Sequence, residues 1–178
     1  MKYIFLNLII FTTIHAQEVI NGHTLPPEPD PVANNATLLG IDVNDNGVRD
    51  DVERWIYKTY KDKHPIHIDI AMQAARGYKL VLEHPEKAKL IHDIVSAPIF
   101  CEGYYRVFAD IFGDTKYIKK KILGTQFDTI YFNVAKRNNA YSKYQQYLSG
   151  DFYTVPRPSE GKKYCDFNIS KYDKSLNQ

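Results

Sequence analysis

Oxygen-bearing side chains stand at regular intervals between residues 42 and 53. Calcium takes roughly six to eight oxygen ligands, and a loop of about twelve residues can supply them from positions 1, 3, 5, 7, 9 and 12. Position 6 must turn sharply, and Gly47 occupies it. The spacing therefore predicts one Ca²⁺ site, which uses a backbone carbonyl at position 7 and a two-oxygen carboxylate at position 12. The predicted ligands are Asp42, Asn44, Asn46, Val48, Asp50 and Glu53.

The predicted ligand set contains only three carboxylates, and its two other side chains are amides. Few acids indicate modest affinity, and extracellular calcium modules bind in the range of about 0.1 to 1 mM. We therefore expect a permanently occupied structural site in a compartment that contains calcium at such levels. The alternative is a turn without metal, because Asp50 and Asp51 also stabilise the start of a helix through its dipole.

The loop resembles the EF-hand family, and more closely the single-helix loops of dockerins and other exported bacterial proteins. In those proteins an Asp-x-Asn-x-Asn/Asp-Gly loop leads directly into a helix, and the resemblance covers about residues 41–60. No second loop of this type occurs in the sequence, which argues against a calmodulin-like sensor. The wider stretch from Leu25 to Ile56 resembles a group of uncharacterised exported proteins of Gram-negative bacteria. That second resemblance implies export and no particular activity.

The first sixteen residues have the features of a secretory signal peptide. Lys2 gives the positive start, and Tyr3 to Ile14 form an apolar run that is followed by Ala16. The run is shorter than the roughly 20 residues that span a bilayer, so an uncleaved anchor is the weaker alternative. We expect a mature chain that begins at Gln17, lies in the periplasm or outside the cell and keeps no stable membrane span.

Cys101 and Cys165 are the two cysteines of the chain. In an oxidising compartment an even number with none left over predicts a disulfide. The bond would tie a central helix to the C-terminal tail, and two free, buried thiols are the alternative. Neither cysteine has a pair of histidines at the spacing of a zinc finger.

The formal net charge of +2 is too small to indicate a nucleic-acid partner. Acids dominate the stretch from Glu18 to Glu53, and lysines compensate for them later in the chain. The fourteen tyrosines suit contacts with a protein partner, although tyrosines at the rim of a core would give the same composition. We interpret the later lysines as a solvated helix face, and they include Lys116, Lys119, Lys120 and Lys121.

Apolar residues recur at helical spacing through most of the chain after Asp50. One helix should end before His64-Pro65 and the next before His84-Pro85. A third should follow, which Pro98 either kinks or splits. We predict a short helix around residues 118–123 and one long helix over residues 127–148, capped by Gly150.

The predicted fold is all-α, a bundle of five or six helices with irregular ends. Residues 1–16 are assigned to the signal peptide, residues 17–41 to a proline-rich arm and residues 42–178 to a single calcium-binding helical domain. The arm is expected to be irregular, and it is either a linker or a segment packed along the domain. The tail from about residue 151 is also expected to be irregular and to be held by Cys165.

No catalytic motif stands out in the sequence. We therefore expect an exported, non-enzymatic protein with structural Ca²⁺ that binds a protein partner. An immunity or inhibitor protein that neutralises a periplasmic toxin or hydrolase is one alternative. A hydrolase with structural calcium is another, and its active site would have to come from scattered acids such as Glu102 and Asp110.

Overall fold

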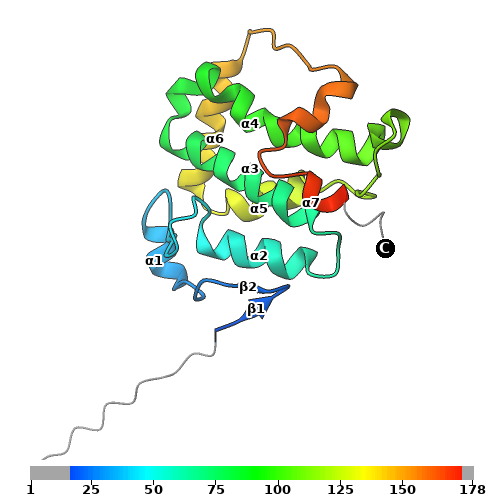
Figure 1. The fold of residues 1–178 in the computed structure, drawn as a ribbon. Coiled ribbons are helices and arrows are strands. Elements are labelled where there is room, and N and C mark those ends of the chain that lie inside the picture. The colour runs from blue at the N-terminus through cyan, green and yellow to red at the C-terminus, as the bar shows by residue number, and fades with distance from the viewer. Residues whose placement is uncertain (1–16, 174–178) are drawn as a thin grey trace, which may run out of the picture.

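The computed structural model describes residues 17–173, so the predicted signal peptide lies outside the described residues. A mainly helical domain is confirmed for this part of the chain (Figure 1). The central helix, α3, packs between α2 and α4, and α6 packs on both α3 and α4. The longer helices are α2 (Asp50–Tyr60), α3 (Ile66–Glu83), α4 (Ala88–Gly103), α5 (Thr125–Tyr131) and α6 (Ala135–Leu148).

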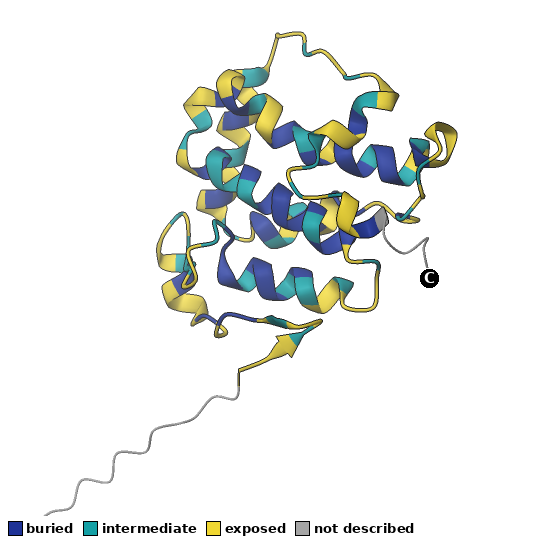
Figure 2. Cartoon of the chain, viewed as in Figure 1, coloured by how far each residue is buried: buried dark blue, intermediate teal, exposed yellow. Residues whose placement is uncertain are grey.

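The burial of α3 explains its composition. A helix with neighbours on most sides carries apolar residues on most of its faces. Ile66, Ile70 and Val81 are fully buried, and α3 is among the most buried helices in Figure 2. The predicted ends of the first two helices, before His64-Pro65 and before His84-Pro85, are confirmed.

Pro98 does not split the third helix. The chain passes from a short 3₁₀ helix, η1 (Pro85–Lys87), into α4, which runs on through Pro98. It then continues as a π-helical turn, η2 (Tyr104–Phe108), and a further 3₁₀ turn, η3 (Ala109–Phe112).

The short helix predicted around residues 118–123 is wrong. This segment is irregular and runs beside η2, where the amide of Ile118 donates to the carbonyl of Tyr105 (3.3 Å). Ile118 and Ile122 are four residues apart and buried, which produced the helical pattern. The backbone needs no helical hydrogen bonds, because the buried Glu102 carboxylate accepts the amide of Ile122 (3.0 Å) and that of Leu123 (2.9 Å).

The long helix predicted over residues 127–148 is also wrong, because α5 and α6 are separate helices. Val134 has an extended backbone (φ −132°, ψ 154°) and precedes the first residue of α6. The break lets Arg137 turn toward the N-terminal arm, and the side chain of Asn133 accepts a hydrogen bond from it (2.6 Å). The predicted end is confirmed, since Gly150 follows α6 with a positive φ of 86°.

The N-terminal arm contains regular structure where an irregular segment was predicted. Asn21-Gly22 closes a hairpin between β1 (Val19–Ile20) and β2 (His23–Thr24), which pair antiparallel. An Asn-Gly turn is a strong local hairpin signal. A short helix, α1 (Pro31–Ala36), follows and is capped by the side chain of Asp30.

The arm is packed along the domain and is not a free linker. Arg54 of α2 binds the carboxylates of Glu18 (2.6 Å) and Glu28 (2.5 Å). Arg137 of α6 binds backbone carbonyls within residues 34–38. Two helices of the domain thus hold the two halves of the arm.

Many of the tyrosines belong to the core. Tyr78 of α3 contacts the rings of Phe127, Tyr131, Phe132 and Tyr141 at centroid distances of 4.9 to 6.2 Å. Its hydroxyl donates to Asp128 at 2.8 Å, so the polar end of the ring is satisfied. This core accounts for part of the tyrosine content without a binding surface.

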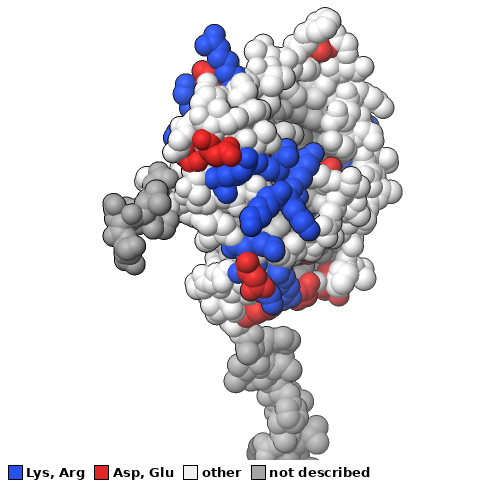
Figure 3. Space-filling view, turned by 90° about the vertical axis from the view of Figure 1, so that its right-hand side faces the viewer, with Lys and Arg blue, Asp and Glu red and all other residues white. Residues whose placement is uncertain are grey.

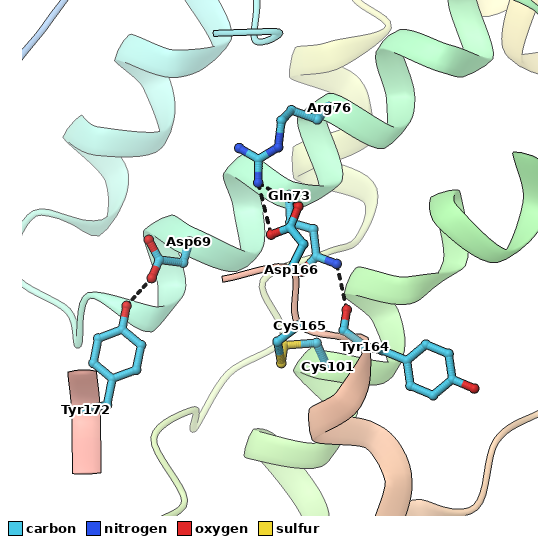
Figure 4. Close-up of a disulfide and its surroundings, with 8 residues drawn as sticks. All are labelled: Asp69, Gln73, Arg76, Cys101, Tyr164, Cys165, Asp166 and Tyr172. Atoms are coloured by element: carbon cyan, nitrogen blue, oxygen red, sulfur yellow. Dashed lines mark hydrogen bonds and ion pairs between the residues drawn. A yellow bond between two sulfur atoms is a disulfide. The ribbon is translucent and has the colours of Figure 1, made fainter. Parts of the chain in front are cut away.

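The predicted disulfide between Cys101 and Cys165 is confirmed (Figure 4), with a Cα–Cα distance of 5.1 Å. The bond holds the C-terminal segment against α4. Next to it, the Gln73 side chain of α3 donates to the carbonyl of Tyr164 (2.7 Å). The tail also contains a 3₁₀ helix, η4 (Pro158–Tyr164), and a final turn, α7 (Ser170–Asp173).

η4 lies very close to α4 and η2 because residue 161 is glycine. A Cβ atom on Gly161 would lie 2.7 Å from the Cβ of Tyr104 and 2.9 Å from the carbonyl oxygen of Phe100. The tail is thus fitted to the helices it crosses.

None of the helices in residues 17–173 is both long enough and apolar enough to cross a membrane.

Candidate metal centre

The loop of residues 42–53 wraps around the carboxylate of its first residue. Asp42 accepts hydrogen bonds from the amide of Asn46 to Oδ1 (3.1 Å) and from the amide of Gly47 to Oδ2 (3.0 Å). Gly47 has a φ of 82°, the left-handed conformation that glycine adopts without strain. The sharp turn predicted at position 6 is therefore present in the structure.

Glu53 brings the last position of the loop to its third and fifth positions. Its Oε2 accepts hydrogen bonds from the amide groups of Asn46 (2.7 Å) and Asn44 (3.2 Å). Glu53 belongs to the first turn of α2 and is 0 % exposed. The side chains of Asn44 and Asn46 thus meet at the buried carboxylate of Glu53, and all three residues are predicted ligands.

The donor set of these three side chains fits a hard cation. Rotating an Asn amide by about 180° exchanges its NH₂ group for its oxygen, with little change in shape. Asn44 and Asn46 would then present oxygen atoms on the side where Glu53 already presents its carboxylate, with loss of the hydrogen bonds that these oxygens accept from the amides of Asn46 and Val48. Oxygen atoms of amides and carboxylates are the ligands that Ca²⁺ prefers.

Asp50 closes the loop from the other side. Its amide donates to the carbonyl of Ile41 (2.8 Å), and its Oδ1 accepts from the amide of Val43 (3.1 Å). The pKa of Asp50 is raised to about 6, mainly by burial and in part by the charges of Asp42 and Glu53, while the hydrogen bond from the Val43 amide acts in the opposite direction. The loop therefore concentrates negative charge that a bound cation would neutralise.

The seventh position is fixed by its side chain. Val48 is fully buried in the main core, and its amide donates to the side-chain oxygen of Asn46 (2.8 Å). Its carbonyl is the group that we predict as a ligand. Anchoring the side chain limits how far this carbonyl can move.

Acidic side chains alone do not form a cage here. Within residues 17–173, no group of three or more His, Cys, Asp and Glu side chains is arranged to hold a metal ion. Lys79 also approaches the loop, with its Nζ 3.7 Å from Oδ2 of Asp42. A cation in this loop would depend on the amide and carbonyl oxygens as much as on the three carboxylates.

Two residues that the sequence analysis did not single out attach the loop to its surroundings. His23 of β2 lies with Nε2 2.6 Å from Oε1 of Glu53 and stacks on Tyr57 (4.1 Å between centroids). Arg49 is buried and donates to the carbonyls of Tyr131 (3.0 Å) and Ile130 in α5. His23 is thirty residues from Glu53, so no local pattern could have predicted the contact.

No known protein family, curated protein or solved structure matches this chain. The assignment of the loop therefore depends on its residues and geometry.

The acids considered for a hydrolase site each have other partners in the structure. Glu102 is buried and binds the backbone of residues 122–123, while Asp110 pairs with Lys116 (3.0 Å). Both side chains have structural partners, and Glu102 is needed to hold an irregular segment in place.

Proposed function

We propose that this chain is an exported, non-enzymatic protein that binds one Ca²⁺ in residues 42–53 and binds a protein partner through its helical domain. The observation that carries the calcium proposal is the meeting of Glu53 with the amides of Asn44 and Asn46. These groups come from positions 3, 5 and 12 of a loop whose position 6 already has the required turn.

The proposed role of the ion is to stabilise the junction between the arm and α2. Glu53 receives a contact from His23 of the arm and from the loop amides, while its backbone belongs to α2. Bound calcium would neutralise the carboxylates of Asp42, Asp50 and Glu53 together. Removing the ion would leave their mutual repulsion at the point where three segments join.

A structural role suits this loop better than a switch. The loop has no partner loop, and its exit helix is already packed through the fully buried Val52 and Ile56. A sensor needs two arrangements of similar free energy, of which one is selected by the ion. A helix fixed in the core offers no second arrangement.

Calcium is expected to raise the melting temperature of the chain that starts at Gln17 by about 4–7 °C over the value in excess EGTA. With a dissociation constant of about 0.1 mM and about 2 mM free calcium, linkage gives about 1.8 kcal/mol. Differential scanning calorimetry measures the shift.

Two matched variants of the same loop sharpen that experiment. Asp42→Asn changes a proposed ligand and should abolish the shift, whereas Asp45→Asn makes the same chemical change at an exposed position that is not a ligand. The proposal fails if calcium leaves the unmodified chain unaffected, or if the two variants lose the shift equally.

Exposed apolar side chains on α4 favour a protein partner. Leu90 and Ile94 lie one helical turn apart and are 80 % and 56 % exposed, and such faces commonly mark contact surfaces. An immunity or inhibitor protein for a periplasmic toxin or hydrolase is the second candidate function.

Leu90→Asp is expected to abolish co-purification of this partner from a native cell extract, because it places a charge in the contact. The control is Val32→Asp in α1, a residue that is also 80 % exposed. Loss of the partner with both variants, or retention with both, would argue against this face of α4.

A further inference from the structure

We propose that the surface formed by residues 116–121 and η3 binds the headgroups of anionic lipids, so that the protein attaches peripherally to a membrane. Figure 3 shows a band of Lys and Arg side chains down the face on the right-hand side of Figure 1. This inference is independent of the calcium proposal, since no residue of the loop takes part in it.

The lysines of this surface are held outward by buried neighbours. Ile118, which precedes these lysines in the sequence, is fully buried, and Ile122, which follows them, is 5 % exposed. The carboxylate of Glu102 fixes the far end through the amides of Ile122 and Leu123. Lys119, Lys120 and Lys121 between these anchors are exposed. We predicted these lysines on a solvated helix face, but they lie on an irregular segment held at both ends.

These three lysines differ from most others on the surface in having no acidic partner. Among the side chains that the structure describes, the ion pairs include Lys89, Lys116 and Lys162 but not Lys119, Lys120 or Lys121. An unpaired ammonium loses no internal contact when it meets an external anion. Each lysine near an anionic bilayer contributes favourably to binding.

Further cations are brought to the same place by ring contacts. Tyr117 stacks on His64 (4.1 Å between centroids), which places the exposed Lys63 beside the segment. The hydroxyl of Tyr117 also donates to the carbonyl of Tyr172 (3.4 Å), next to Lys171, whose ammonium pairs with Asp69. Lys63 thus adds a cation from a distant part of the sequence, while the charge of Lys171 is balanced by its acidic partner.

Apolar side chains next to the lysines favour a membrane over an acidic protein surface. Ile111 is 70 % exposed and Phe112 is 46 % exposed in η3. The ion pair of Lys116 with Asp110 ties the start of the lysine segment to this turn. A basic surface with protruding apolar side chains suits the boundary between headgroups and acyl chains.

The test uses the chain that starts at Gln17, which contains every residue the structure describes. Its binding to vesicles of phosphatidylcholine with phosphatidylglycerol is compared with its binding to phosphatidylcholine alone in a sedimentation assay. We expect binding only to the anionic vesicles, and a steep decrease as salt is added. Equal binding to both vesicles, or binding to neither, would overturn the proposal.

Matched variants locate the surface. Lys119→Glu with Lys120→Glu should lower the partition coefficient at least about tenfold. Lys87→Glu with Lys143→Glu changes the charge equally at exposed positions in η1 and α6, which contact each other at the opposite end of α4, and should retain most of the binding. Similarly, Ile111→Ser should weaken binding, and Leu90→Ser should not.

All variants are checked for unchanged melting temperature before the binding assay. A similar loss in the lysine variant and its control would show that only net charge matters, which contradicts a defined surface. Saturable binding of polyglutamate without binding to anionic vesicles would also overturn the proposal, because it would identify an acidic polypeptide as the ligand.

Discussion

Replacing Arg137 by methionine is expected to lower the free energy of unfolding by about 3–4 kcal/mol. The side chain is 0 % exposed, and burial together with the charge of Arg49 lowers its pKa to about 10. It donates to the carbonyls of Asn34 (2.8 Å) and Leu38 (2.9 Å) and to the side chain of Asn35 (2.9 Å). Methionine keeps apolar bulk but leaves these acceptors without a donor.

Urea unfolding of the Arg137→Met variant measures this loss. The neighbouring Lys136 also donates to the arm, at the carbonyl of Ala36 (2.8 Å), but it is exposed. Lys136→Met should therefore cost no more than about 0.5 kcal/mol. Similar losses for the two variants would show that burial of the arginine does not determine its contribution.

Removing the disulfide, with Cys101→Ala and Cys165→Ala together, should cost about 4 kcal/mol. The bond closes a loop with a sequence separation of 64 residues, and its loss frees the unfolded chain from that constraint. The tail would then be held mainly by contacts such as the hydrogen bond between Gln73 and Tyr164.

Chemical denaturation with and without a reducing agent tests this prediction. The reducing agent should destabilise the unmodified chain by a similar amount and leave the double variant unchanged. A loss below about 1 kcal/mol would mean that the native contacts of the tail suffice without the bond.

The parts of the fold that the sequence predicted well depend on local patterns. α2 and α3 have apolar residues at helical spacing and end before prolines, so neighbouring residues determine them. The candidate ligand residues of the loop are likewise confined to twelve consecutive positions, so the sequence alone shows the whole candidate set, while calcium binding itself stays a prediction.

The predictions that failed concern segments whose conformation depends on distant partners. Ile118 and Ile122 have helical spacing, but the side-chain carboxylate of Glu102 accepts the backbone amides of Ile122 and Leu123 and so makes an irregular segment acceptable. Arg54 and Arg137 are charged residues that would ordinarily be placed on the surface. They are buried because the arm packs over them and supplies their acceptors, Glu18 for Arg54 and the carbonyl of Asn34 for Arg137. These acceptors lie up to about one hundred residues away in the sequence.

The packing of the arm also has a consequence for the order of folding. The arm is synthesised before α6, and Arg137, which binds the carbonyl of Asn34, lies 103 residues further along the chain. Contacts at such a separation form late, because closing the intervening loop costs entropy until the segments between them are structured. We therefore expect residues 34–38 of the arm to reach their final position only after α6 has formed. The earlier part of the arm, which contacts Arg54 and Glu53 of α2, can pack as soon as that helix is present.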